Sequence, residues 1–141
     1  MTNGIEIRRL QSGDDELLAR GAHLFDEPLK PTAIERFLGA TDHHLLLGLI
    51  DGDPAGFVSG VELTHPDKGV EMFLYELAVE EQLRRRGVGK ALVEALAAIA
   101  RERGCYGMWV LTDEDNIAAV TTYRRAGATG SERTFLLEWR F

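Results

Sequence analysis

The chain has 141 residues, 45% of them hydrophobic and 28% charged, which is enough for one hydrophobic core and too little for two. A net charge of −7 argues against nucleic acid as a partner, and no apolar run is long enough to span a membrane. The N-terminus MTNGIEIRRL lacks the regions of a signal peptide and Cys105 is the only cysteine, so we expect a single domain over residues 1–141, cytoplasmic and without a disulfide.

The N-terminal third is expected to hold one strand and two helices. Residues 5–10 alternate apolar and polar side chains, which is typical of a strand with one solvent-exposed face. Acidic residues 14–16 favour the start of a helix, which we expect to run to Asp26. Residues 27–31 contain two prolines that end it, and Thr32 is the expected N-cap of a second short helix.

Three strands are expected next. Residues 44–50 and 55–64 are rich in apolar side chains, and the turn sequence at residues 51–54 predicts that they form a hairpin. A second turn at residues 65–69 leads into an apolar run from Met72 to Val79, which has the length and composition of a buried strand.

A glycine- and arginine-rich loop joins this strand to an amphipathic helix. The helix is indicated by the spacing of Val88, Leu92, Leu96 and Ile99, and Gly104 ends it. Such a loop gathers the unpaired N–H groups of the first helical turn at the positive end of the helix dipole, which is a binding site for phosphate. The candidate phosphate-binding residues are Arg84, Arg85, Arg86, Gly87, Val88, Gly89 and Lys90.

Two common phosphate-binding loops are excluded by spacing. With Lys90 as its lysine, a Walker-type loop needs glycine at position 84, which is Arg84, and serine or threonine at position 91. A dinucleotide fingerprint that starts at Gly87 needs glycine or alanine at position 92, which is Leu92.

The last third is expected to hold two strands and a helix. Tyr106–Thr112 predicts a buried strand, and the helical crossover before it predicts that it runs parallel to the strand at 72–79. A charged loop at 113–116 precedes a short helix, Ile117–Ala126, and Arg133–Phe141 is expected to close the sheet as a final strand.

The charge is distributed unevenly along the chain. Residues 1–83 contain 16 Asp and Glu against 6 Lys and Arg, a net −10, whereas residues 84–141 contain 7 against 10, a net +3. One interpretation is that the basic half receives a polyanion and the acidic half a cationic acceptor. The other is that acidic surface only keeps the protein in solution.

Two motifs resemble those of the GNAT superfamily of N-acetyltransferases. The first, similar to its acyl-CoA signature, is Arg84-x-x-Gly87-x-Gly89 after a strand ending in Leu77-Ala78-Val79. The second, similar to its downstream segment, is Asn116-x-x-Ala119-x-x-x-Tyr123 followed by Ala126-Gly127. The resemblance covers essentially the whole chain and implies the GNAT fold, an α/β fold with a mixed sheet, in the order β-α-α-β-β-β-α-β-α-β with splayed parallel central strands.

A narrower resemblance is to the type I aminoglycoside 3-N-acetyltransferases. It rests on His23-Leu24-Phe25-Asp26, on Tyr75-Glu76-Leu77-Ala78-Val79 and on a chain end soon after the sixth strand. It implies an aminoglycoside acceptor, modified at its 3-amino group, and thus antibiotic resistance. Homodimers are common in the family, and nothing in the sequence tests this for the chain.

The resemblance implies acetyl-CoA as cosubstrate. The backbone of Leu77, Ala78 and Val79 would pair with the pantetheine amides, and a strand N–H would polarise the thioester carbonyl. The short helix with Asn116, Ala119 and Tyr123 would flank the CoA arm, although Asn116 is also a natural helix N-cap.

Two residues are candidates for proton transfer. Glu76 is the one carboxylate in an apolar strand, where burial would raise its pKa toward that of a useful base. It either acts as the base or binds the acceptor ammonium, or pairs with an arginine, without moving protons. Tyr123 is the candidate acid for the leaving thiolate, because the family has a tyrosine there beside the sulfur; core packing is the alternative.

Carboxylates at two places are candidates for binding the acceptor, namely Asp113, Glu114 and Asp115 after the last parallel strand, and Asp26 and Glu27 after the first helix. Each group either binds ammonium groups of the acceptor or lies in a solvated loop without a binding role, and the sequence leaves both alternatives open. The four histidines have no metal-ligand spacing, so we expect no metal.

The sequence therefore predicts an acetyl-CoA-dependent N-acetyltransferase for a small cationic amine, an aminoglycoside first of all. Another small amine, such as a polyamine or an amino acid, or a protein N-terminus is the alternative acceptor. A CoA-binding module that does not catalyse is the alternative from another functional class.

Overall fold

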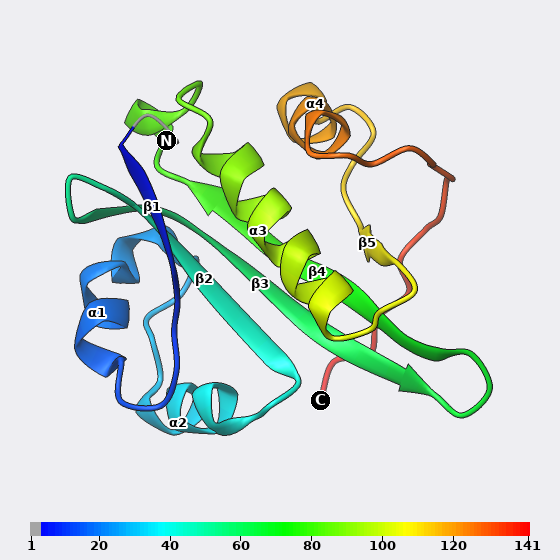
Figure 1. Ribbon diagram of the computed structural model, residues 1–141, viewed down its shortest axis with the longest axis horizontal. Helices are drawn as coiled ribbons and strands as arrows, with labels where there is room; N and C mark the ends of the chain where they lie inside the picture. The colour runs from blue at the N-terminus through cyan, green and yellow to red at the C-terminus, as the bar shows by residue number, and fades with distance from the viewer. Residues whose placement is uncertain (1–3) are drawn as a thin grey trace.

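The computed structural model describes residues 4–141, in which five strands form one mixed sheet (Figure 1). In sheet order the strands are β1 (Ile5–Arg9), β2 (His43–Ile50), β3 (Asp53–His65), β4 (Gly69–Val79) and β5 (Met108–Val110). Neighbours from β1 to β4 are antiparallel, and β5 is parallel to β4. The predicted hairpin of β2 and β3 and the predicted parallel crossover to β5 are therefore confirmed.

Helices cover both faces of the sheet. They are α1 (Asp15–Arg20), the 3-10 turn η1 (Ala22–Leu24), α2 (Pro31–Gly39), the 3-10 turn η2 (Glu81–Leu83), α3 (Val88–Glu102) and α4 (Ile117–Arg125). Because side chains alternate along a strand, Leu46 of β2 faces α3 whereas its neighbours Leu45 and Leu47 face α1 and α2. None of the helices in residues 4–141 is long and apolar enough to cross a membrane.

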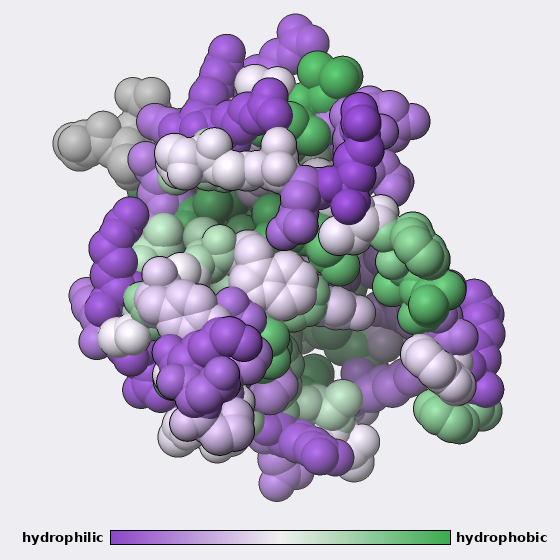
Figure 2. Space-filling model, turned by 90° about the vertical axis from the view of Figure 1, so that its right-hand side faces the viewer, coloured by the Kyte–Doolittle hydropathy of each residue, from purple (hydrophilic) through white to green (hydrophobic). Residues whose placement is uncertain are grey.

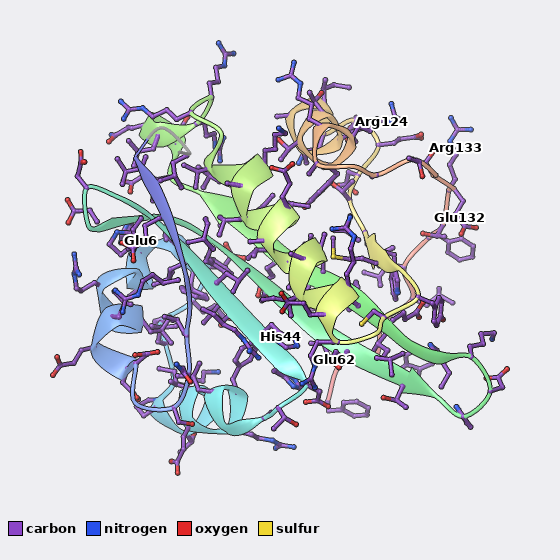
Figure 3. The ribbon with its side chains drawn as sticks, viewed as in Figure 1. Glu6, His44, Glu62, Arg124, Glu132 and Arg133 are labelled. Atoms are coloured by element: carbon purple, nitrogen blue, oxygen red, sulfur yellow. The ribbon has the colours of Figure 1, made fainter. Side chains whose placement is uncertain are left out.

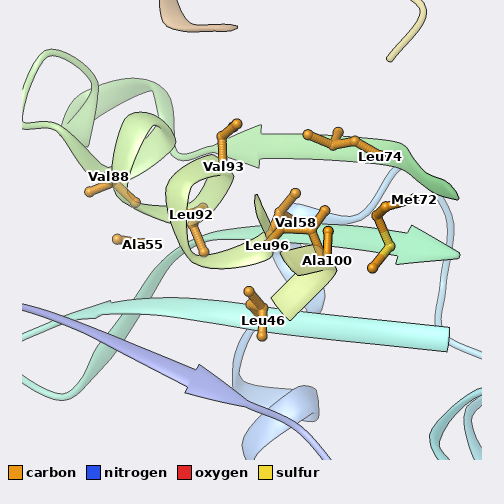
Figure 4. Close-up of a cluster of buried hydrophobic side chains, with 10 residues drawn as sticks. All are labelled: Leu46, Ala55, Val58, Met72, Leu74, Val88, Leu92, Val93, Leu96 and Ala100. Atoms are coloured by element: carbon orange, nitrogen blue, oxygen red, sulfur yellow. The ribbon is translucent and has the colours of Figure 1, made fainter. Parts of the chain in front are cut away.

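The larger core cluster lies between α3 and the sheet (Figure 4). Leu92 and Leu96 of α3 are fully buried there against Val58, Met72 and Leu74. Glycines in β3 let the helix and the strands approach closely. A Cβ at Gly56 would lie 2.7 Å from the Ala78 carbonyl oxygen, and one at Gly60 would lie 2.9 Å from a Leu96 methyl carbon.

Two predicted helix boundaries are wrong. The first helix ends at Arg20, not at Asp26, because Gly21 acts as its C-cap and its N–H donates to the Leu18 carbonyl. The second helix starts at Pro31, with Lys30 as its N-cap, so Thr32 lies inside the first turn. Proline is favoured at the first helical position because its fixed φ suits the helix and that position needs no N–H donor.

Two predictions for the C-terminal third also need correction. The strand predicted over Tyr106–Thr112 is shorter, Met108–Val110, because β4 and β5 diverge after Val110. Before it, the Tyr106 N–H donates to the Val70 carbonyl and the Gly107 carbonyl accepts from the Met72 N–H. The strand predicted over Arg133–Phe141 does not form, since this segment passes behind the sheet in Figure 1 without pairing with a strand. Extended residues become a strand only when a neighbour accepts and donates their backbone hydrogen bonds.

A buried polar network ties β1, β2 and β3 to the end of α3 (Figure 3). His44 is almost fully buried, with Nδ1 2.9 Å from Arg9 Nη2 and Nε2 2.7 Å from Glu62 Oε2. The Arg103 Nε donates to the same Glu62 oxygen at 2.8 Å. A guanidinium has only donors, so His44 Nδ1 must accept; the ring is therefore the neutral tautomer with its proton on Nε2, donated to Glu62.

Because of this network, we expect the folded protein to be less stable in acid. Burial lowers the pKa of His44 below 6.5, so the unfolded chain binds the proton first. The stabilisation is complete above about pH 6.5 and is lost as the pH falls, because the protonated ring cannot accept the Arg9 hydrogen bond and carries a positive charge beside the guanidinium.

Urea unfolding at about pH 7.5 and about pH 5.5 measures this effect. At the higher pH, His44→Gln should have a lower free energy of unfolding than the wild type. Its free energy of unfolding should also change much less between the two pH values than that of the wild type. His43→Gln is the matched control, because His43 is half-exposed. An equal pH dependence in wild type and His44→Gln would contradict the assignment.

Candidate functional site

A β-bulge in β4 sets the direction of the candidate site residues. Ser59 of β3 is paired with Glu76 and the next residue, Gly60, with Leu74, so Tyr75 is an extra residue in β4. Leu74 is buried against α3, whereas Tyr75 and Glu76, two consecutive residues, both line the cavity on the α1–α2 side of the sheet. Without the bulge, consecutive side chains would point to opposite faces.

The predicted splaying of the parallel strands is present. Pairing between β4 and β5 stops at Leu74 and Val110, although β4 continues to Val79. A polar cavity of about 270 Å³ lies beside the strand ends where β4 and β5 separate. Its walls come from the η1 region, β3, β4, the segment after β5, and α4, through Leu24, Asp26, Phe57, Tyr75, Glu76, Leu77, Ala78, Leu111, Thr112, Asn116, Ala119 and Tyr123.

Glu76 lies between this polar cavity and a second one. The second cavity, of about 370 Å³, is mostly apolar and lies between the sheet and the α1–α2 region, with Glu27, Phe37 and Ser59 among its walls. Tyr75 and Glu76 line both cavities. The backbone N–H of Glu76 donates to Ser59 Oγ at 3.2 Å, which holds the strand in place at the bulge.

The surroundings of Glu76 make it a weaker acid than a free glutamate. Burial raises its pKa above 4.5, and the negative charge of Asp26 raises it further. Proton uptake at Glu76 is thus easier than at an exposed carboxylate, which suits a group that accepts a proton from a substrate.

Tyr123 holds its proton firmly. It projects from α4, is partly buried against the larger core cluster, and lines the polar cavity. Burial raises the pKa of Tyr123 above 10, so the phenol is neutral and able to donate across the ordinary pH range. The core packing that the sequence analysis left open and the exposure to the cavity are both present.

Asn116 has a structural contact in addition to its place in the cavity wall. Its Oδ1 accepts from the Ala119 N–H at 3.2 Å, so Asn116 is the N-cap of α4. The cap fixes the start of the helix that carries Tyr123 two turns later.

The arginine and glycine loop forms the N-terminus of α3. Gly87 has φ 86°, a left-handed conformation that suits glycine, and the first helical hydrogen bond runs from the Ala91 N–H to the Gly87 carbonyl. The N–H groups of residues 88–90 therefore belong to the first turn and point out of the helix end. Arg84, Arg85 and Arg86 are exposed around them.

The loop lies against α4, next to Tyr123. A Cβ at Gly89 would be 3.3 Å from Thr122 Cγ2, 3.5 Å from Val79 Cγ2 and 3.8 Å from Leu77 Cδ2. Glycine at this position therefore lets the helix N-terminus, the end of β4 and α4 meet.

Only some of the remaining predicted site residues line one of the two cavities. Asp26, Leu77, Ala78 and Ala119 line the polar cavity, and Glu27 lines the apolar one. Val79 and residues 84–90 lie beyond the polar cavity at the end of β4 and the start of α3. The three carboxylates predicted for the acceptor, Asp113, Glu114 and Asp115, are exposed and line neither cavity; Glu114 pairs with Arg133 at 2.9 Å.

Some wall residues were missed by sequence reasoning. Ser59 is a polar side chain in an apolar strand, and that contrast could have singled it out. Phe57, Leu111 and Thr112 give no such signal, since only the packing brings them to the cavity. Within residues 4–141 no group of three or more His, Cys, Asp or Glu is placed to hold a metal ion.

Comparison with known families and curated proteins gives consistent matches. The family model described as "Acetyltransferase (GNAT) family" matches residues 8–128. A mycothiol acetyltransferase from Salinispora arenicola is 32% identical over 144 residues, which covers 90% of this chain and 45% of the relative. A streptothricin acetyltransferase from Streptomyces lavendulae is 31% identical over 77 residues, covering 55% of this chain and 39% of the relative. The chain thus spans less than half the length of either relative.

Solved structures share the fold at lower identity. An aminoglycoside acetyltransferase from an uncultured soil metagenomic sample, solved with sisomicin, has a TM-score of 0.89 at 20% identity, covering 99% of this chain and 97% of the other. Aminoglycoside N-acetyltransferase AAC(6')-Iy with CoA has a TM-score of 0.79 at 23% identity, covering 97% and 95%. The similar structures include a 6'-type enzyme and so do not single out the 3-N type.

Proposed function

Because the chain belongs to the GNAT acetyltransferase family, we propose that it is an acetyl-CoA-dependent N-acetyltransferase that transfers acetyl directly to a small cationic amine. One observation carries the proposal: Glu76 and Tyr123, a candidate base and a candidate acid, line the same polar cavity where the parallel strands separate. The candidate phosphate-binding loop adjoins that cavity where Gly89 approaches Leu77, a residue of the cavity wall.

The CoA moiety is assigned to the side of the cavity near α3. The N–H groups of residues 88–90 and the exposed Arg84, Arg85 and Arg86 suit its pyrophosphate. The edge of β4 at Leu77, Ala78 and Val79 faces no strand on the β5 side, which leaves backbone groups available to the pantetheine amides. This arrangement directs the thioester toward Tyr123.

The reaction then needs three proton transfers, two from the nitrogen of the acceptor and one to the leaving thiolate. Glu76, directly or through water, takes a proton from the acceptor ammonium, and the free amine attacks the thioester carbonyl to form a C–N bond. A β4 N–H stabilises the oxyanion. The C–S bond breaks, and Tyr123 donates its proton to the leaving thiolate. The attached nitrogen loses its second proton to the tyrosinate, directly or through water, which restores the phenol and leaves CoA and the neutral acetylated amine.

The acceptor is assigned to the side of the cavity with Asp26 and Glu76. Two carboxylates that line one cavity suit a substrate with several ammonium groups, and Glu27 lines the adjoining cavity. We favour an aminoglycoside, with the 3-amino group as the position that the sequence resemblance indicates. The mycothiol acetyltransferase relative, which covers 90% of this chain, favours a mycothiol-type acceptor as the second candidate.

Release of free thiol from acetyl-CoA in the presence of each acceptor class tests the proposal. We expect turnover with aminoglycosides and, with mass spectrometry of the product, one added acetyl group at a defined amine. Turnover only with a mycothiol-type acceptor, a polyamine, an amino acid or a protein N-terminus would contradict the proposed acceptor. The proposed acetyl transfer would still hold. CoA binding without turnover on any amine would show that the protein is a CoA-binding module and would contradict the proposal that it is an enzyme.

A further inference from the structure

The function proposed above leaves most of the apolar cavity between the sheet and the α1–α2 region unused. Its volume of about 370 Å³ is typical of a site for a small molecule. Its walls are mainly apolar and come from both layers of the fold, with Ile34, Phe37 and Leu38 on α2 and Leu45 and Val61 on the sheet. A cavity with such walls takes up an apolar group more readily than water.

The charged residues of this cavity do not favour a polycation inside it. Glu27 and Lys30 both line the wall and are both exposed, and their opposite charges bring no net charge to it. Ser59, a buried polar side chain of the wall, is 5% exposed, and its Oγ accepts the Glu76 N–H. A positive charge is therefore best placed at Glu76, at the border with the polar cavity.

The two cavities meet at Tyr75 and Glu76, which line both of them. Elsewhere two stacked rings lie between the cavities, Phe25 in the wall of the apolar one and Phe57 in the wall of the polar one, with centroids 4.1 Å apart. A molecule whose amine lies at Glu76 in the polar cavity can therefore extend past Tyr75 into the apolar cavity.

This junction is open to solvent. Tyr75 is 62% exposed, and its ring contacts Phe73, which stacks on Trp109 of β5. Figure 2, which views the side of the molecule with β5, shows a hollow between the main body and the hydrophobic side chains to its right. An amine can therefore reach the junction from solvent.

We propose that the enzyme also acetylates primary amines that carry a single apolar group, with the ammonium at Glu76 and the apolar group in the apolar cavity. A phenyl ring or a chain of about six carbons is small enough for this cavity. Burial of the apolar group then supplies the binding energy that several ammonium groups supply for a polycation.

This acceptor class rests on the function proposed above, because acetyl transfer still takes place in the polar cavity. The reaction is unchanged. The nitrogen gives up two protons and forms the C–N bond, the C–S bond breaks, and CoA leaves as the thiol. Only the part of the acceptor beyond the amine is bound differently.

Thiol release from acetyl-CoA with 2-phenylethylamine and with ethylamine tests the proposal. The two amines differ only in the phenyl ring, whose burial should raise kcat/KM by about 10- to 100-fold. Ala33→Phe, which fills the cavity from α2, should make the two kcat/KM values about equal. Ala19→Phe is the matched control, since Ala19 is an exposed residue of α1 that lines neither cavity, and it should keep the wild-type ratio.

Binding of 2-phenylethanol tests the cavity apart from the reaction, because this compound has the same ring and no amine. It should inhibit acetylation of 2-phenylethylamine competitively. It should also shift the methyl NMR signals of Ile34 and Leu38, which line the cavity, in the wild type and in Ala19→Phe but not in Ala33→Phe.

Equal kcat/KM values for the two amines in the wild type would overturn the proposal, and so would a wild-type ratio in Ala33→Phe or unchanged Ile34 and Leu38 signals at millimolar 2-phenylethanol. If aminoglycosides are acetylated and the phenyl ring brings no gain, this acceptor class is wrong and the proposed function stands. If no amine releases thiol, the proposed function is wrong, and acetylation of apolar amines is wrong with it.

Discussion

Replacing Glu76 with Gln is expected to lower kcat/KM by about 10²–10³-fold, because the amide cannot accept a proton from the acceptor ammonium. The wild-type kcat/KM should rise with pH through the pKa of Glu76, which burial and then Asp26 raise above 4.5, since the base must be ionised. The kcat/KM of Glu76→Gln should not show this rise with pH. The measurement is the pH profile of thiol release at low acceptor concentration.

The control for this variant is Glu71→Gln, which changes a carboxylate of the same strand that pairs with His65 and Tyr106, away from the cavities. It should keep both the rate and the profile. A Glu76→Gln enzyme with unchanged kcat and a raised KM would assign Glu76 to ammonium binding alone, which is the alternative that the sequence left open.

Replacing Tyr123 with Phe is expected to lower kcat by about 10²-fold while the affinity for CoA changes little. The phenol lines the cavity and burial raises its pKa above 10, so the wild type is in the donor form at neutral pH. Phe keeps the packing against the core and removes only the hydroxyl. Single-turnover kinetics with acetyl-CoA, and calorimetry with CoA, separate the two effects.

Tyr106→Phe is the matched control, since Tyr106 is exposed and its hydroxyl donates to Glu71 rather than entering the cavity. Its kcat should equal that of the wild type. If Tyr123→Phe also retained full kcat, the thiolate would have to be protonated by another group or by water, and Tyr123 would be a core residue only. Loss of CoA affinity together with kcat would instead assign the hydroxyl to binding.

Local patterns were sufficient for the elements whose hydrogen bonds are local. The apolar spacing along α3 and the glycines around it predict the helix, its ends and the exposed N–H groups at its start, because each helical bond joins residues four apart. The predicted end of the first helix was wrong because the signal of Gly21 was overlooked. Gly21 is the C-cap of α1, and the helix ends at Arg20, six residues before the predicted end at Asp26.

The candidate site depended on contacts between distant parts of the chain. The sequence singles out Glu76 as a carboxylate in an apolar strand and Tyr123 by its spacing from Asn116, yet it does not show that both line one cavity. It also gave equal weight to two acidic groups, and only the packing of the η1 region against β3 brings Asp26 to the wall and leaves Asp113 outside.

By itself, then, the sequence determined the order of the elements through β5 and α4, the start of α3 with its exposed N–H groups, and the residue types available for proton transfer. Tertiary structure alone decided the bulge at Tyr75, which turns Glu76 toward the cavities, and the unpaired state of residues 133–141. The reason is that a strand is defined by its neighbour. Register, bulges and edges depend on which segments meet, and alternation along one segment holds no information about its partner.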